Sequence, residues 1–136
     1  MLICIDAGHG LFTSGKRCLK SIDPNETREW MLNRRIADKL QNLLEDYECQ
    51  TMRVDDTTGE KDVPLAERVS LANEAGADVY LSIHHNAGMN GGAGGGIVIF
   101  AATMAGKMAL KLQKAVYDAA VERTGLRGNR ANSTPQ

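Results

Sequence analysis

The sequence has few cysteines, no excess of charge of either sign and no long apolar run. Its three cysteines are an odd number and form no CxxC pair, so neither a disulfide framework nor a thiolate zinc site is indicated, and we expect free thiols. The 16 basic side chains are balanced by 17 acidic ones, which gives no electrostatic reason to expect a nucleic acid or membrane partner. No segment among the 136 residues approaches the roughly 18 to 20 apolar residues of a membrane span.

The amino terminus also lacks the pattern of a secretion signal. Residues 1–6 are predicted to begin directly with a buried strand, and neither a basic segment nor a long apolar segment precedes it. We therefore expect synthesis in the cytoplasm. If the protein acts outside the cell, we expect it to leave by lysis, by a non-classical route or as part of a longer precursor.

Short apolar runs alternate with helical patterns along a chain that is long enough for one domain. Apolar runs bounded by turn residues predict strands at residues 2–5, 49–54, 78–83 and 97–100. Because each parallel strand pair needs a right-handed crossover that a helix supplies, the alternation predicts an α/β fold, with a mostly parallel twisted sheet flanked by helices. Ligand sites in such sheets gather at the carboxyl ends of the strands.

Three segments carry apolar residues at helical spacing. They predict helices at about residues 26–46, 64–76 and 104–123, the first after the turn residues Asp23-Pro24-Asn25 and the second with Pro64 as its first residue. The inward faces are expected to carry Leu65, Val69 and Ala72 in the second helix and Met108, Leu112, Ala115 and Ala119 in the third. The residues from Gly125 onward show neither strand nor helix periodicity and are expected to form a loop.

Two of the three histidines directly follow predicted strands. His9 closes the turn after residues 2–5, and His84 follows residues 78–83, so both are expected at the same edge of the sheet. Glu29 lies near the start of the first predicted helix, and helix starts in this fold face that edge. No histidine falls in an HExxH or HxxE pair, which excludes the helix-borne zinc motifs. Two imidazoles and one carboxylate are a known catalytic zinc set that leaves a fourth position open for water.

Each of these residues also has a simpler interpretation. A histidine after a strand is often a loop residue, and Glu29 is equally compatible with an exposed carboxylate that stabilises the positive end of a helix. A domain that binds some other small ligand at the same strand ends would show the same pattern. The spacing alone does not choose between these interpretations.

Three segments together carry a family resemblance. They are residues 5–10 with the sequence IDAGHG, residues 65–73 with LAERVSLAN, and residues 81–87 with LSIHHNA. In order and spacing they resemble the zinc-dependent N-acetylmuramoyl-L-alanine amidases of autolysins and phage endolysins, over residues 2–126. That family cleaves the amide bond between N-acetylmuramic acid and L-alanine. The resemblance therefore implies a zinc-activated water and bacterial peptidoglycan as substrate.

The resemblance also implies roles for single residues. The family's D-x-G-H-G turn, its E-x-x-x-N-x-x-I-A stretch and its S-I-H-x-N-A turn carry the zinc ligands, which correspond here to His9, Glu29 and His84. His85 occupies the variable place of the last turn. His85 and Asn86 are candidates for substrate binding, although for His85 an incidental exposed imidazole is the favoured interpretation.

Two neighbouring side chains have open roles. Asp6 and Asn86 are each expected either to hold a ligand histidine by a hydrogen bond or to cap a turn. Trp30, the only tryptophan, is interpreted as a packing residue in preference to a platform for sugar rings.

The sequence departs from the family pattern at its carboxyl end. Family members continue into a strand resembling L-V-E-x-G-F, whose Glu is the general base or acid, and no such stretch occurs before Gln136. Glu67 and Glu122 are expected to be structural or solvated glutamates and poor substitutes. We therefore interpret residues 1–136 as one amidase domain without its C-terminal part and without a wall-binding domain, acting at the cell wall. The alternative is a zinc-containing peptidoglycan-binding module with impaired catalysis, and the oligomeric state is left open.

Overall fold

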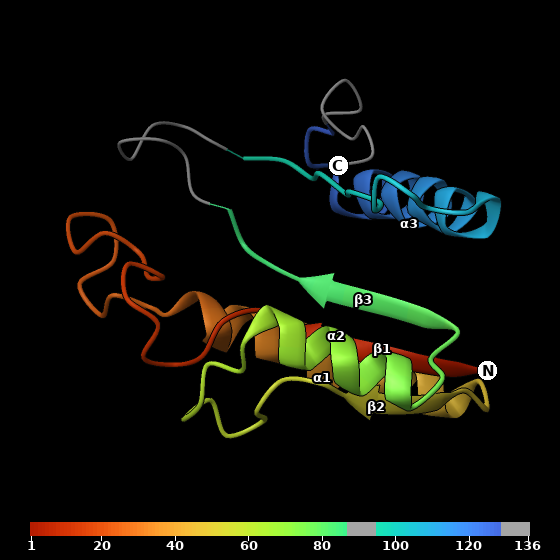
Figure 1. Ribbon diagram of the computed structural model, residues 1–136. Helices are drawn as coiled ribbons and strands as arrows, with labels where there is room; N and C mark the ends of the chain where they lie inside the picture. The colour runs from red at the N-terminus through yellow and green to blue at the C-terminus, as the bar shows by residue number, and fades with distance from the viewer. Residues whose placement is uncertain (87–94, 129–136) are drawn as a thin grey trace. The chain divides into compact units, whose positions relative to one another are not determined.

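The computed structural model describes residues 1–86 and 95–128, and the chain divides into two compact units at residue 87. The first unit contains β1 (Leu2–Ala7), α1 (Glu29–Asp46), β2 (Gln50–Arg53), α2 (Leu65–Glu74) and β3 (Val79–Ile83), and the second contains α3 (Lys107–Thr124) (Figure 1). No helix within the described ranges is long and apolar enough to cross a membrane.

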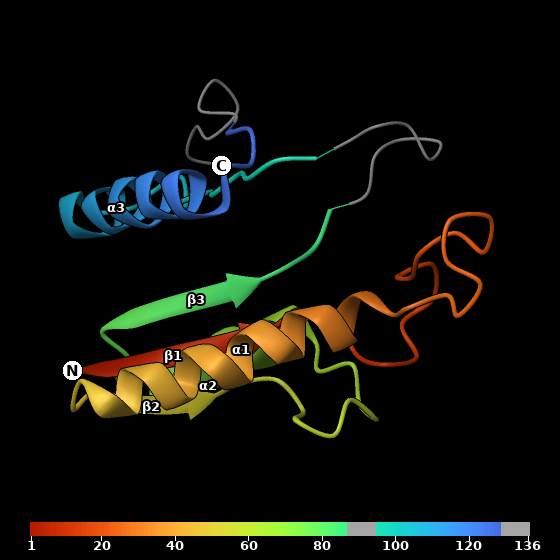
Figure 2. The same ribbon diagram turned by 180° about the vertical axis from the view of Figure 1, so that it is seen from behind.

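The three strands of the first unit form one parallel sheet in the order β2-β1-β3 (Figure 2). In the register, Ile5 lies beside Arg53 on one side and beside Leu81 on the other, and Ala7 lies beside Ile83. β1 is thus the central strand, and its residues from Ile3 to Ala7 are all buried. The sheet confirms the α/β class and the parallel arrangement predicted from the alternation of strands and helices.

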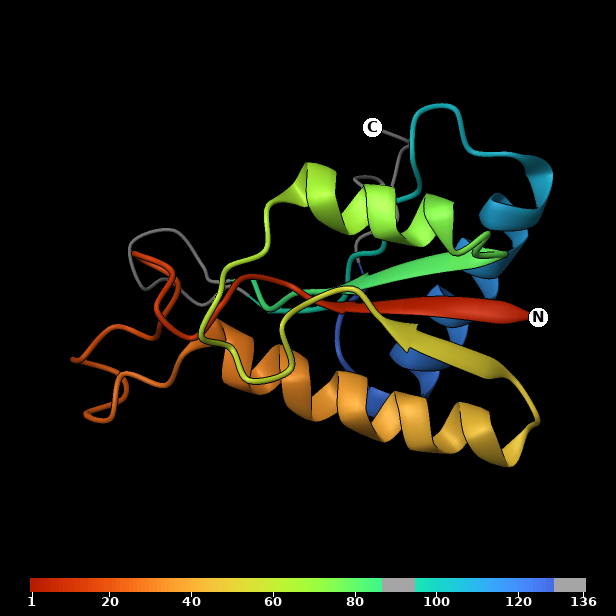
Figure 3. The ribbon, with the colours of Figure 1, turned by 60° about the horizontal axis from the view of Figure 1, so that its bottom comes forward.

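The two helices of the first unit cover opposite faces of the sheet (Figure 3). Successive side chains of a strand point to opposite faces, so β1 supplies both cores. Ile3, Ile5 and Ala7 pack with Trp30 and Ala37 of α1. On the other face, the buried residues are Cys4 of β1, Val54 and Ala72 of α2. A strand that is buried on both faces explains the continuous apolar run with which the sequence begins.

The prediction of a fourth strand at residues 97–100 is wrong. Ile97 makes only an isolated parallel bridge with Gly128, in which the Ile97 amide donates to the Arg127 carbonyl at 2.8 Å. Phe100 is exposed. An apolar run becomes a strand only where a neighbouring chain pairs with it over several residues, and within the described part of the second unit that pairing stops after one residue.

The inward face predicted for α2 is also wrong in part. Leu65 is 72% exposed and Val69 is 42% exposed, whereas Arg68 and Ala72 are buried, at 3% and 5%. The helix is rotated toward Arg68 because this guanidinium pairs with the buried carboxylate of Asp6 in β1. A charge in the core must be paired, and here that requirement outweighs the burial of two aliphatic side chains.

The inward face predicted for α3 is wrong in part as well. Met108, Ala115 and Ala119 are exposed, Leu112 is half-buried, and Tyr117 is the buried side chain of this helix. Tyr117 packs where the chain returns at Gly128, so closely that a side chain at Gly128 would overlap the phenol. The helix ends at Gly125, whose φ of 66° is the left-handed conformation that terminates helices, as the change of pattern at this residue predicts.

Candidate functional site

The ends of β1 and β3 bring two histidines together. The two strands end at the same level, and beyond them the Gly8 amide donates to the Ile83 carbonyl at 3.0 Å. His9 and His84 follow at once, with their ring centroids 4.8 Å apart and their planes at 86°. The His84 ring occupies the space in which a Cβ of residue 8 would lie, so this approach requires glycine there.

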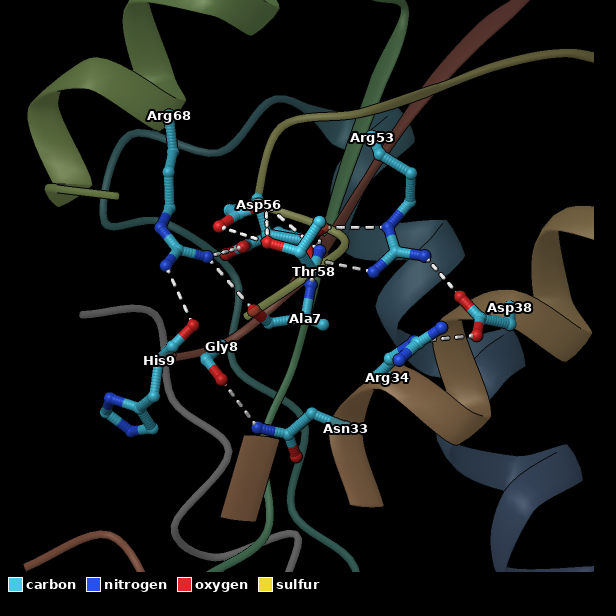
Figure 4. A network of polar contacts seen from close by, with 12 residues as sticks. Ala7, Gly8, His9, Asn33, Arg34, Asp38, Arg53, Asp56, Thr58 and Arg68 are labelled. Carbon is cyan, nitrogen blue, oxygen red and sulfur yellow. Dashed lines mark hydrogen bonds and ion pairs between the residues drawn. The ribbon is translucent and has the colours of Figure 1, made fainter. Parts of the chain in front are cut away.

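His9 adopts a backbone conformation that is unusual for a residue other than glycine. Its φ is 68°, in the left-handed region. Two buried side chains bind the turn around it: Arg68 Nη2 donates to the His9 carbonyl at 3.1 Å, and Asn33 Nδ2 donates to the Gly8 carbonyl at 3.0 Å (Figure 4). The turn is therefore attached to both α2 and α1, the helices on the two faces of the sheet.

Glu29 reaches the same place as the first residue of α1. A long loop leads to it, and the Glu29 amide donates to the Lys16 carbonyl at 3.0 Å, beside an isolated bridge between Arg17 and Arg28. A carboxylate in the first turn is favoured by the positive end of the helix dipole. The helix begins three residues later than the predicted residue 26, because Asp23 binds the amides of Asn25 and Thr27 and holds them in a turn before it.

The three side chains present their ligand atoms to one another. Glu29 Oε1 lies 3.1 Å from His84 Nδ1, Glu29 Oε2 lies 3.5 Å from His9 Nε2, and all three ligand atoms lie within 4.8 Å of one another. Tetrahedral coordination at about 2.0–2.1 Å would place ligand atoms roughly 3.3 Å apart. The two measured separations lie close to this value, so the donor set fits a small divalent ion.

His9 carries two signs of a metal ligand. Its Nε2 is buried and has no hydrogen-bond partner among the described residues, which is costly unless something else binds it. Burial lowers the pKa of His9; the Glu29 carboxylate opposes this shift, and the charges of Lys16 and His84 add to it. The neutral imidazole is the form that binds metals, so the burial of His9 favours ligation.

His85 is anchored beside this cluster. Its backbone amide donates to Glu29 Oε1 at 3.2 Å, and its Nδ1 lies 2.8 Å from Asn33 Oδ1. Because Asn33 uses its amino group on Gly8, its oxygen accepts from His85 Nδ1–H. His85 and Asn86 are both exposed. Their role in substrate binding remains a prediction.

Asp6 has a different role from the two that the sequence suggested. It neither holds a histidine side chain nor caps a turn; its carboxylate pairs with Arg68 and accepts from Tyr80 Oη at 2.9 Å and Ser82 Oγ at 2.7 Å. Burial and the adjacent Asp6 raise the pKa of Tyr80, so the phenol keeps the proton that it donates. Trp30 is 3% exposed within the core, which confirms its interpretation as a packing residue.

Arg68 is the residue of this region that sequence reasoning missed. It is part of one of the three family-like segments, but nothing in the local pattern distinguishes it from a solvated helical arginine. The usable signal was Asp6, a carboxylate in an otherwise apolar strand, which requires a buried cation somewhere in the fold. Asp55 also gives no local signal: it stands in a polar stretch of the sequence, yet it is buried and paired with Arg53.

Glu67 and Glu122 are surface residues. Glu67 pairs with Lys61 at 2.8 Å, and Glu122 is exposed on α3. Among the residues that the structure describes, the histidine, cysteine and carboxylate groups placed to share a metal ion are His9, Glu29 and His84.

Comparison with known proteins agrees with this geometry. A family model described as N-acetylmuramoyl-L-alanine amidase matches residues 3–135. The N-acetylmuramoyl-L-alanine amidase CwlM of Bacillus licheniformis is 38% identical over 93 residues, which are 68% of this chain and 33% of that protein. The chain thus spans about a third of the length of this curated relative.

Solved structures are similar over nearly the whole chain. The N-acetylmuramoyl-L-alanine amidase from Clostridium difficile 630 has a TM-score of 0.82 at 29% identity, covering 99% of this chain and 69% of that one. The catalytic domain of CwlV, an N-acetylmuramoyl-L-alanine amidase from Bacillus (Paenibacillus) polymyxa var. colistinus, has a TM-score of 0.73 at 27% identity, covering 93% and 67%. AmiC2 of Nostoc punctiforme, at 23% identity and a TM-score of 0.77, shares the fold.

Proposed function

Because this chain belongs to the N-acetylmuramoyl-L-alanine amidase family, we propose that it takes part in hydrolysis of the amide bond between N-acetylmuramic acid and L-alanine in bacterial peptidoglycan. The observation that carries the proposal is the convergence of His9, Glu29 and His84 at one edge of the sheet. CwlM of Bacillus licheniformis and the similar Clostridium difficile structure are both named N-acetylmuramoyl-L-alanine amidases.

The metal of this site is proposed to be Zn²⁺, held by His9, Glu29 and His84. Zinc supplies a Lewis acid that polarises the scissile carbonyl and acidifies a water molecule. The side chains of His9 and Glu29 are 19% and 11% exposed, whereas that of His84 is 42% exposed. Among the described residues the site opens at His84, and we propose that a large substrate approaches from this side. His85 is next to His84 in the chain and is also exposed.

The general base is proposed to lie outside the residues described. Glu29 is the carboxylate of the three-residue cluster, and the nearby Asp62 is engaged by Arg68 at 3.2 Å and by Thr13 at 2.6 Å. Positioned proton transfer is typically worth about 10² to 10⁴ in rate. We therefore expect these 136 residues to bind zinc while hydrolysing walls slowly.

A second candidate function rests on the same observation. A protein that keeps the metal cluster and its opening, but uses no base, would be a zinc-containing module that binds peptidoglycan without turning it over. The two candidates differ in one measurable product, the free amino terminus of L-alanine.

The experiment combines metal analysis with an assay on purified cell walls. After zinc loading and desalting, the protein is expected to retain stoichiometric zinc, and His84→Ala and Glu29→Gln are expected to lose it. His85→Ala is the matched control, since it removes the neighbouring imidazole and keeps the cluster. Equal zinc content in wild type and His84→Ala would contradict the proposed metal site.

The wall assay then separates the two functions. Slow release of L-alanine amino termini by wild type, abolished in Glu29→Gln, supports hydrolysis. Binding to walls without any release supports the binding module.

A further inference from the structure

The turn that carries His9 is held by an unusually complete set of hydrogen bonds from Arg68. This α2 residue donates from Nη1 to the Ala7 carbonyl at 3.0 Å, and from Nη2 to the His9 carbonyl at 3.1 Å. Its Nε donates to the Val63 carbonyl at 2.6 Å, and the guanidinium also pairs with Asp6 and, at 3.2 Å, with Asp62. A guanidinium has five N–H donors, and five acceptors are present.

The peptide groups of Ala7 are bound from the other side too. The Ala7 amide donates to Asp55 Oδ1 at 3.2 Å, and Asp55 is held by Arg53 through Nε at 2.7 Å and Nη2 at 2.6 Å. Figure 4 shows Arg68 and Arg53 approaching Ala7 from opposite sides. The last residue of β1 therefore has both its amide and its carbonyl bonded to buried charged groups.

One of these contacts acts directly on the backbone of His9. A residue other than glycine keeps a left-handed φ only where the surroundings impose it, and His9 has a φ of 68°. The Arg68 contact fixes the carbonyl of His9 itself, so it sets the peptide plane from which the imidazole projects. Asp55, which Arg53 holds, binds instead the amide of Ala7, two residues before His9.

We propose that Arg68 is a positioning residue for the metal centre: by binding the carbonyls of Ala7 and His9 it holds the His9 imidazole in the orientation that receives zinc. The inference rests on the proposed zinc site. Arg68 is buried, its hydrogen bonds go to backbone carbonyls and to two carboxylates, and it acts on the metal site through the backbone of His9. Residues that support metal ligands in this way typically change metal affinity 10- to 100-fold when they are replaced.

The first test compares Arg68→Lys with Tyr80→Phe. Lysine keeps the charge opposite Asp6, but its single ammonium has three donors and no fork with which to bind Val63, Ala7 and His9 together. We expect zinc affinity, measured by competition with a chelator, to fall about 10- to 100-fold. The visible spectrum of the Co²⁺-loaded protein should change as well. Tyr80→Phe removes a different hydrogen bond to the same Asp6 and should leave both readouts as in wild type.

The second test uses wild-type protein and so does not depend on the folding of a variant. Coupling is reciprocal, so zinc must strengthen the contact between Arg68 and His9 by the factor with which Arg68 strengthens zinc binding. We expect zinc to slow proton exchange at the Arg68 guanidinium about 10- to 100-fold, and to leave Arg53 unchanged.

Unchanged exchange at Arg68, or equal zinc affinity in Arg68→Lys and wild type, would overturn the role of Arg68 alone. Wild-type protein that takes up no zinc would overturn the metal site and this inference with it.

Discussion

At the scale of single residues, Gly8 shows how closely the two strand ends approach. The His84 ring fills the space beside the Gly8 Cα, so the cluster can form only because residue 8 has no side chain. A side chain at this position would push the partly exposed His84 ring out of its place beside Glu29.

Substitution of Gly8 by alanine is expected to displace His84 from Glu29. An added methyl group would overlap the imidazole, and relief by rotation of His84 breaks the 3.1 Å contact with the carboxylate. We expect zinc affinity, measured by chelator competition, to fall at least about 10-fold. The control is Gly106→Ala, since a Cβ at Gly106 meets nothing within 4 Å. Loss of affinity in the control, or its retention in Gly8→Ala, would contradict the explanation.

The three cysteines should differ in reactivity in the native protein. Cys4 is fully buried in β1, and burial raises the pKa of its thiol, whereas Cys18 and Cys49 are half-buried. Both access and the fraction of thiolate are lower for Cys4. With a thiol reagent followed by mass spectrometry, we expect Cys18 and Cys49 to be labelled first. In denaturant the three should react alike, and early labelling of native Cys4 would contradict its burial.

At the scale of elements, α2 turns a charged side chain toward the core in place of two aliphatic ones. Arg68 and Ala72 lie one turn apart and define its buried side, while Leu65 and Val69 face outward. The helix thus contributes less apolar burial than its sequence suggests, and it contributes the cation that Asp6 needs.

This orientation predicts that substitutions at two aliphatic positions of α2 lower the free energy of unfolding by different amounts. Leu65→Ala should change the free energy of unfolding by no more than about 0.5 kcal/mol, because the side chain is 72% exposed. Ala72→Leu should lower it by about 1–3 kcal/mol, because the site packs against Cys4 and Val54 and has no room for a larger side chain. Denaturant titration of both variants measures the two values. A larger cost at Leu65 than at Ala72 would contradict the exposure of Leu65.

The loop between β2 and α2 is organised by Asp56. Its carboxylate accepts from the Lys61 amide at 2.8 Å and the Thr58 amide at 2.9 Å, and these hydrogen bonds lower the pKa of Asp56 to about 2. This pKa lies below the ordinary value of 3.8, so ionised Asp56 stabilises the folded loop. That stabilisation is fully present above about pH 4 and is lost as the pH falls through about 2.

The amide proton shifts of Thr58 and Lys61 report this titration. We expect them to move together with a midpoint near pH 2, and to stay constant in Asp56→Asn. A midpoint near 3.8 in wild type would show that the loop does not hold the carboxylate as described.

At the scale of the whole molecule, the proposed metal joins segments that are distant in sequence. His9, Glu29 and His84 come from the end of β1, the start of α1 and the end of β3. An ion bound to all three in the native state has no equivalent site in the unfolded chain, so its binding free energy adds to stability.

Zinc should therefore raise the thermal midpoint of the protein. At a free zinc concentration 100 times the dissociation constant the gain is about 2.7 kcal/mol, which corresponds to several degrees for a chain of this size. Differential scanning calorimetry with zinc and then with excess chelator should show a reversible shift. His9→Ala is the control and should show none, and an equal shift in that variant would place the stabilising zinc elsewhere.

Much of the fold followed from the sequence because its signals are local. The buried run before Asp6, the helical spacing after Asn25 and the alternation of strands with helices depend on neighbouring residues, and they predicted a parallel sheet. The convergence of His9 and His84 also followed, since parallel strands end at one edge. Glu29 needed the family resemblance, because a carboxylate at a helix start has the same local pattern whether or not it binds a metal.

The tertiary structure alone decided what depends on partners distant in sequence. An apolar run at residues 97–100 could not show that its strand pairing within the described residues is a single bridge to Gly128, and a helical arginine could not show that five acceptors surround it. Both outcomes are set by groups that are brought near only by folding. Charge pairing in the core is one of these non-local interactions: the pair with Asp6 turns α2 toward Arg68, and the buried guanidinium then also binds the His9 carbonyl.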